Sequence, residues 1–154
     1  MKYLYIGIAI LVVLVAGFAT LHKVSPVGWG WWGETNTSSG VALKGYDPVA
    51  YFEQSKAVPG SEEYSADWAG ATWHFSSTEH RDLFEANPEH YAPQFGGFCT
   101  FAVSKGLTAD ISPDAWYVGD GKLYVFADQK VRDEWVAGLA DGTLRVSEEN
   151  WAER

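Results

Sequence analysis

The residues best suited to chemistry in this chain are one cysteine and four histidines. Cys99 lies in the stretch APQFGGFCTFAV (residues 92–103), shortly after a double glycine. The glycines permit a tight turn, and the following residues predict a short helix with Cys99 in or near its first turn. The amides at a helix start stabilise a thiolate, the form that binds metal ions or attacks electrophiles. Phe98 and Phe101 flank the cysteine, however, and a free cysteine beside phenyl rings is also typical of a packed core.

Imidazole groups are the second component of a candidate metal site. His74 lies on a predicted strand, and His80 lies in the first or second turn of the helix predicted to follow it. Cysteine and histidine together suit copper or zinc, so the candidate ligand set is Cys99, His80 and His74. His90 is expected on the surface. Asp47 precedes a proline and is expected to be a helix cap or a polar residue of the site.

A thiolate at Cys99 could also act as a nucleophile, with His74 or His80 as its base. The sequence contains no serine triad pattern, phosphate-binding loop or CxxC pair. A single cysteine also has no partner for an intramolecular disulfide. An enzyme is therefore the least favoured interpretation, and we assign no catalytic residue.

The predicted elements form a small single domain of the α+β class, with two antiparallel β-hairpins and several short helices. Alternating residues on both sides of a glycine-containing turn predict the hairpins, at residues 63–75 and 115–126. A capping box at Ser76–Glu79 predicts a helix start, residues 128–142 have the period of an amphipathic helix, and residues 147–151 predict one more turn. The aromatic residues predicted to be buried are Trp73, Phe75, Phe84, Tyr91, Trp116, Tyr124 and Trp135.

An apolar stretch precedes this domain. Residues 3–21, YLYIGIAILVVLVAGFATL, contain no charged residue. As a helix they would span about 28 Å, close to the thickness of the hydrocarbon core of a bilayer. We therefore expect residues 1–23 to be a transmembrane helix or a signal peptide, with cleavage after Ala19 in the second case. Either way the globular part lies on the periplasmic side, tethered to the cell membrane through the helix or released after cleavage.

Residues 24–40 are rich in Gly, Ser and Thr and predict a linker to a domain at residues 41–154. The three tryptophans of the linker suit either the membrane–water interface or docking on the domain. From residue 34 onward the chain has nine basic and twenty acidic residues, a net charge of −11. Such a surface repels nucleic acid, which we do not expect as a partner.

Several stretches of the sequence resemble one family in order and spacing. GYDPVAYF (residues 45–52), YSADWAGATWHFSSTEHRDLFEANPEHYAPQFGGFC (64–99), DGKLYVF (120–126) and the closing NW are similar to YHS domain proteins of the exported or membrane-anchored bacterial type. The resemblance implies a small α+β domain. It also implies an association with metal ions, because the family is similar to small domains found beside heavy-metal and copper transporters.

The family's ligand positions are only partly retained. Compact metal-linked members begin with Asp-Pro-Val-Cys, and this chain has Ala50 after Asp-Pro-Val. Those members also have Phe-Cys-Ser-x-x-Cys, where this chain has Ser76 and His80 at the two cysteine positions. Cys99 instead matches the Gly-Gly-aromatic-Cys element of the longer, exported members. A metal site in this chain would therefore need other ligands than those of the compact members.

Three functions remain as expectations. The first is an exported, membrane-tethered module that binds or handles a metal ion, copper or else zinc. The second is a binding or interaction domain without metal, in which Cys99 and the aromatic residues form the core or line a pocket. The third is a thiol-based redox or nucleophilic enzyme.

Overall fold

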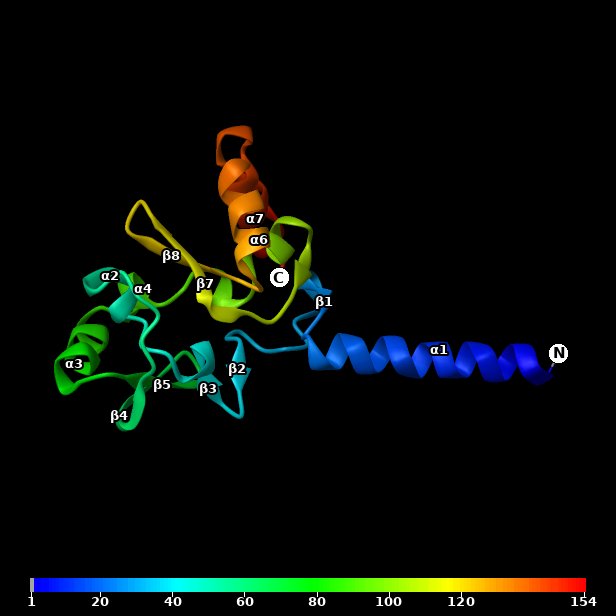
Figure 1. The fold of residues 1–154 in the computed structure, drawn as a ribbon, viewed down its shortest axis with the longest axis horizontal. Coiled ribbons are helices and arrows are strands. Elements are labelled where there is room, and N and C mark those ends of the chain that lie inside the picture. The colour runs from blue at the N-terminus through cyan, green and yellow to red at the C-terminus, as the bar shows by residue number, and fades with distance from the viewer. Residues whose placement is uncertain (1) are drawn as a thin grey trace.

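The computed structural model describes residues 2–154 and the side chains from Tyr5 onward, and it confirms the α+β class (Figure 1). The helices are α1 (Lys2–Leu21), α2 (Ala50–Glu53), α3 (Thr78–Ala86), α4 (Pro88–Tyr91), α5 (Thr100–Ser104), α6 (Gln129–Ala137) and α7 (Thr143–Ala152). The strands are β1 (Ser25–Pro26), β2 (Thr37–Ser38), β3 (Val41–Ala42), β4 (Ser61–Trp68), β5 (Ala71–Phe75), β6 (Leu107–Thr108), β7 (Ser112–Gly119) and β8 (Lys122–Phe126). Short 3-10 turns are η1 (Val27–Trp29), η2 (Leu43–Gly45), η3 (Phe95–Gly97) and η4 (Leu139–Asp141).

Both predicted hairpins are present. β4 pairs with β5 across Ala69 and Gly70, and β7 pairs with β8 across Asp120 and Gly121. All four turn residues have positive φ, which matches the right-handed twist of the flanking strands. The first hairpin belongs to a four-stranded sheet in the order β2-β3-β5-β4, whereas β7 and β8 form a separate two-stranded sheet.

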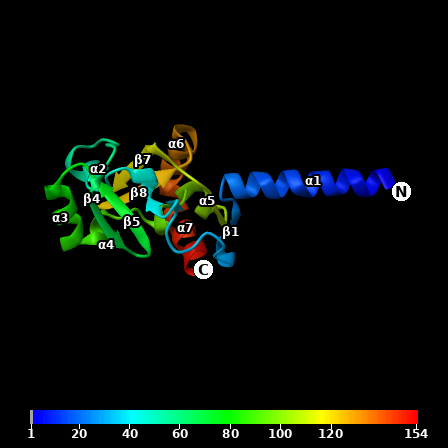
Figure 2. The same ribbon diagram turned by 90° about the horizontal axis from the view of Figure 1, so that it is seen from below.

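A single aromatic core lies between the hairpins and helices α3, α5 and α6 (Figures 1 and 2). Every aromatic residue predicted to be buried is buried except Trp116. Trp116 is half-buried, because its ring packs on the edge of the Tyr51 ring at the margin of the core, with the two centroids 5.3 Å apart. Trp116 packs against the core as a partly buried residue, so the expectation that it is largely buried is met only in part.

Two helix boundaries differ from the prediction. Ser77, not Ser76, caps α3 and accepts a hydrogen bond from the His80 backbone N–H at 3.2 Å. The tail forms the ten-residue helix α7 instead of one turn. Ser147 on α7 is buried and accepts a hydrogen bond from the Trp135 indole of α6, so α7 is part of the core packing.

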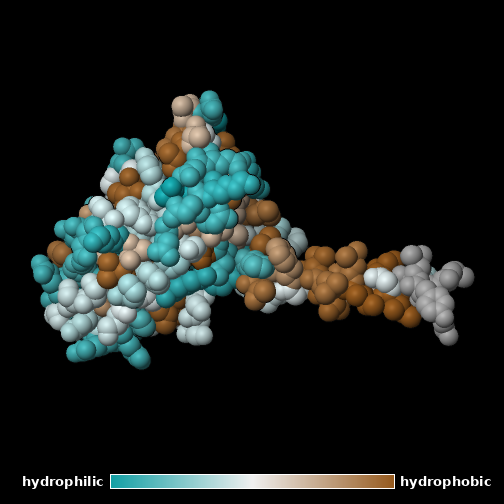
Figure 3. Space-filling model, in the orientation of Figure 1, coloured by the Kyte–Doolittle hydropathy of each residue, from teal (hydrophilic) through white to brown (hydrophobic). Residues whose placement is uncertain are grey.

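Helix α1 projects away from the domain (Figures 1 and 2), and its exposed surface is apolar (Figure 3). The prediction of a transmembrane helix is wrong for the described part of the chain, where no helix has the length and apolar character that crossing a membrane requires. The signal peptide remains a prediction.

Residues 24–40, predicted as a linker, instead pack on the domain, and we call them the strap. The strap contributes β1, which pairs with β6, and β2, which pairs with β3. Asn36 in the strap is buried, and Trp32 packs against the core. Trp29 and Trp31 are 57% and 64% exposed and stack on each other with ring centroids 4.4 Å apart. The strap therefore adds two short strands to the sheets of the domain predicted at residues 41–154.

Candidate functional site

The first candidate site is a buried carboxylate, Asp47, which follows η2. Its Oδ1 atom accepts hydrogen bonds from the backbone N–H groups of Val49 at 2.9 Å and Ala50 at 3.3 Å. Asp47 therefore fixes the chain that enters α2, as expected of a cap.

The other oxygen of Asp47 joins this turn to the start of α3. Oδ2 accepts hydrogen bonds from the Ser76 backbone N–H at 2.8 Å, from Ser76 Oγ at 2.6 Å and from His80 Nδ1 at 2.6 Å. Because an ionised carboxylate only accepts, Nδ1 of His80 carries the hydrogen. The Ser76 hydroxyl is therefore hydrogen-bonded to Asp47 and does not cap α3. Ser77, the next residue, caps the helix instead.

This cluster contains Asp, His and Ser, but it does not have the geometry of a nucleophilic triad. In such a triad the serine and the carboxylate face opposite ring nitrogens of the histidine. Here Ser76 Oγ lies 3.3 Å from Nδ1 of His80, the nitrogen that already faces Asp47. The His80 side chain is also only 11% exposed. The cluster therefore joins two segments of the fold.

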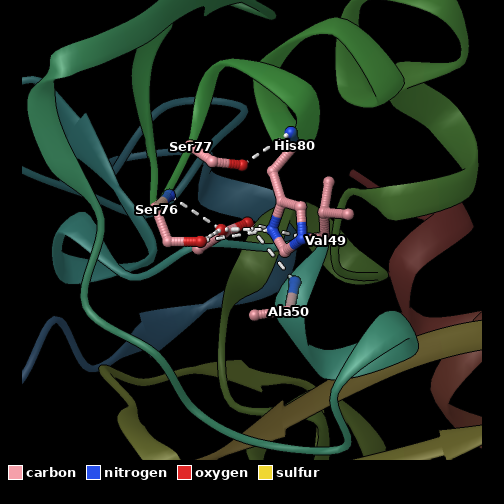
Figure 4. A network of polar contacts seen from close by, with 6 residues as sticks. Val49, Ala50, Ser76, Ser77 and His80 are labelled. Carbon is pink, nitrogen blue, oxygen red and sulfur yellow. Dashed lines mark hydrogen bonds and ion pairs between the residues drawn. The ribbon is translucent and has the colours of Figure 1, made fainter.

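The three positions at which the resemblance places cysteines of the compact YHS members meet at this cluster. Ala50, Ser76 and His80 all lie around the Asp47 carboxylate (Figure 4). The side chain of Ala50 is a methyl group. The Ser76 hydroxyl and the His80 imidazole are both hydrogen-bonded to Asp47. None of them supplies the soft sulfur ligand of the compact members.

Cys99 lies elsewhere, at the N-terminal end of α5, and it is only 2% exposed. Its Sγ atom accepts a hydrogen bond from the Ala127 backbone N–H at 3.3 Å. Burial raises the pKa of the Cys99 thiol, and hydrogen bonds from backbone amides, including that of Ala127, oppose the increase without cancelling it. Cys99 is therefore a protonated thiol that packs in the core, the second of the two interpretations left open by the sequence.

His74 lies on β5 and lines a cavity of 430 Å³. The same cavity contains the ion pair between Lys44 Nζ and Asp110 Oδ2, 2.9 Å apart. Among the residues that the structure describes, no three His, Cys, Asp or Glu side chains are placed to hold a metal ion. The structure brings His80 and Asp47 together but does not assemble Cys99, His80 and His74 into one site. These residues therefore do not fit the metal centre that the resemblance implies.

A second candidate site was missed by the sequence analysis. Three tryptophans are among the residues that line one pocket of 220 Å³, which we call the indole pocket: Trp68 at the end of β4, Trp73 on β5, which is only 2% exposed, and Trp151 on α7. The Trp73 indole N–H donates to the Trp68 carbonyl at 3.0 Å, and these two rings are 6.0 Å apart between centroids. Trp151 packs on Phe95 and Phe98, with ring centroids 5.9 and 6.1 Å away. Aromatic walls of this kind are typical of small-molecule sites.

The strap closes the indole pocket at Glu34 and Thr35. It is held there by Asn36, whose backbone N–H donates to the Gly96 carbonyl at 2.8 Å and whose side-chain amide donates to the Gly97 carbonyl at 3.1 Å. Gly96 has φ +59°, and a Cβ atom on it would lie 2.1 Å from the Glu34 carbonyl oxygen. The double glycine thus allows the strap to approach η3 and complete the pocket.

No sequence signal linked the three tryptophans, because they lie on separate elements and meet only in the folded chain. Trp68, Trp73 and Trp151 all occur within stretches that carry the YHS resemblance. Comparison of the chain with protein-family models, characterised proteins and solved structures gives no match. The YHS resemblance therefore rests on the motifs of the sequence.

Proposed function

We propose that this chain is an exported domain of the YHS type that acts by binding a small ligand in the indole pocket. The observation that carries the proposal is the convergence of Trp68, Trp73 and Trp151 on one pocket closed by the strap. A volume of 220 Å³ is below the roughly 300–1,000 Å³ of sites for drug-sized molecules, so the ligand has few heavy atoms.

The reactive side chains support binding over catalysis or metal handling. Cys99 is buried as a thiol whose pKa burial raises. His80 is nearly enclosed and its Nδ1 is bonded to Asp47. Neither residue lines the indole pocket, where Glu34 is the one ionisable side chain. The polar side chains of the pocket lining are Glu34 and Thr35, and the lining contains no cysteine or histidine.

Two observations support the remaining parts of the proposal. The meeting of positions 50, 76 and 80 around Asp47 supports the YHS type, because the resemblance assigns these positions to one site. The apolar stretch at residues 3–21 supports export by a signal peptide. Cleavage after Ala19 would keep the strap attached to the domain, since the His22 carbonyl already accepts a hydrogen bond from the Asp110 N–H at 2.9 Å.

A screen of small fragments by ligand-observed NMR tests the proposal. The full chain in a non-ionic detergent is compared with Trp68→Ala and Trp151→Leu, and with Trp31→Ala as the matched control. Trp31 is 64% exposed and does not line the pocket. We expect fragments that bind the wild-type chain and the control but lose binding in both pocket variants, with near-native circular dichroism. Loss of binding in the control alone, or no fragment bound by the wild type, would contradict the proposal.

A further inference from the structure

We infer that the ligand of the indole pocket is a small organic cation with a methylated ammonium group, recognised by the tryptophan rings and the carboxylate of Glu34. This inference rests on the proposed function and adds the chemical class of the ligand.

The rings provide the first part of the recognition. The face of an indole carries partial negative charge and attracts a cation placed within about 6 Å of the ring centroid. Trp151 already makes such a contact in this structure, because the guanidinium carbon of Arg154 lies 4.4 Å from its centroid. Arg154 is not among the residues that line the pocket, whereas Trp151 is.

Glu34 provides the second part. It is the one charged side chain of the pocket lining, it is exposed, and it makes no ion pair with any residue that the structure describes. Arg154 is a cationic residue close enough for the charge of Glu34 to affect it. Burial lowers the pKa of Arg154, and the carboxylate of Glu34 partly counteracts this effect. The Arg154 side chain is held by stacking on Trp151 and Phe98, whose ring centroids lie 4.4 and 5.4 Å from its guanidinium carbon.

The balance of polar and apolar walls selects the kind of cation. A primary ammonium group needs about three hydrogen-bond acceptors to replace its water. The side chains of the pocket lining offer two acceptor groups, the Glu34 carboxylate and the hydroxyl oxygen of Thr35, whose hydrogen is donated to the Ala69 carbonyl at 3.0 Å. A methylated ammonium group donates few or no hydrogen bonds and presents methyl groups that suit indole walls. The net charge of −11 from residue 34 onward further attracts cations to this surface.

The test uses choline and 3,3-dimethylbutan-1-ol, which have the same shape but differ in charge. Affinities are measured by calorimetry for the full chain in a non-ionic, uncharged detergent. We expect choline to bind at least about tenfold more tightly than the neutral alcohol. Glu34→Gln should weaken choline binding by about three- to tenfold and leave the alcohol unchanged. The matched control is Glu62→Gln, which removes the same charge from an exposed position on β4 outside the pocket, and it should change neither affinity.

The outcomes separate this inference from the proposed function. Equal affinities for the two compounds, or no effect of Glu34→Gln on choline, would overturn the cation inference and leave a neutral ligand for the pocket. Failure of choline to bind while other fragments bind in a Trp68-dependent manner would also overturn the inference alone. If no fragment binds, the proposed function itself fails.

Discussion

Replacement of Asp47 by Asn should destabilise the fold strongly although the two side chains have nearly the same size. The Asp47 carboxylate is fully buried and is the common acceptor for two backbone N–H groups at Oδ1 and three donors at Oδ2. An asparagine has one acceptor oxygen and one amide nitrogen in their place. In either orientation of the amide, its NH₂ group faces at least two hydrogen-bond donors, and it cannot accept a hydrogen bond from them.

The expected magnitude follows from those donors. A buried donor without an acceptor costs about 1–3 kcal/mol, and breaking a buried charged contact costs about 3–5 kcal/mol. We therefore expect Asp47→Asn to lower the free energy of unfolding by about 3–5 kcal/mol, a large share of the stability of a domain of this size.

Chemical denaturation of the full chain, followed by tryptophan fluorescence, measures this loss as a shift of the midpoint at constant m value. Asp82→Asn is the matched control, because Asp82 is 60% exposed and pairs with Arg81 at the surface. The control should leave the midpoint unchanged. A loss below about 1 kcal/mol for Asp47→Asn would refute the role of this carboxylate as the acceptor that joins the two segments.

Three further predictions concern the strap, the buried phenols and the thiol. Gly96→Ala should lower the free energy of unfolding by about 1–3 kcal/mol, because a Cβ atom would meet the Glu34 carbonyl and φ of residue 96 is positive. The Asn36 N–H should then exchange its hydrogen faster than in the wild-type chain, and an unchanged exchange rate would contradict the prediction. Burial raises the pKa of Tyr51, and it raises that of Tyr124 to about 12. The unfolded phenols release their protons near pH 10 and the folded ones only at higher pH, so stability should fall as the pH rises from about 10 to 12. Tyr51→Phe should reduce that slope, and an unchanged slope would count against the burial of this phenol. The buried Cys99 thiol should react with a disulfide reagent at pH 8 only as fast as the protein opens. The copper or zinc content of the purified chain should be the same in Cys99→Ser as in the wild type. Rapid labelling of the thiol, or metal lost only in the variant, would show a reactive site.

Features set by neighbouring residues could be predicted from the sequence. The hairpin turns at residues 69–70 and 120–121 are determined by a glycine and its neighbour, and both hairpins form where expected. Asp47, expected as a helix cap or a polar site residue, accepts hydrogen bonds from the backbone N–H groups of Val49 and Ala50, although the N-cap residue of α2 is Val49. Burial of the alternating aromatic residues on β5 followed from the period of two, whereas β8 is buried on both faces from Leu123 to Phe126.

Features set by residues far apart in the sequence could not be predicted. The α3 cap lies one residue later than predicted because Asp47, from another segment, takes Ser76. The strap has the composition of a linker, and only the contacts of Asn36 with the carbonyls of residues 96–97 show that it docks. For Cys99 the sequence did not show whether helix-start amides would lower the pKa of the thiol more than burial would raise it. In the folded chain the effect of burial is the larger one. The indole pocket depends on three tryptophans that only the tertiary fold brings together.

The central claim, that the indole pocket is the binding site, is tested most directly by fluorine NMR of the chain labelled with 5-fluorotryptophan. The chain has eight tryptophans, whose signals can be assigned by single substitutions. On addition of choline or a bound fragment, we predict shifts for Trp68, Trp73 and Trp151 and constant signals for the exposed pair Trp29 and Trp31. Shifts confined to tryptophans outside the pocket, or shifts that appear only when copper or zinc is added, would contradict the claim.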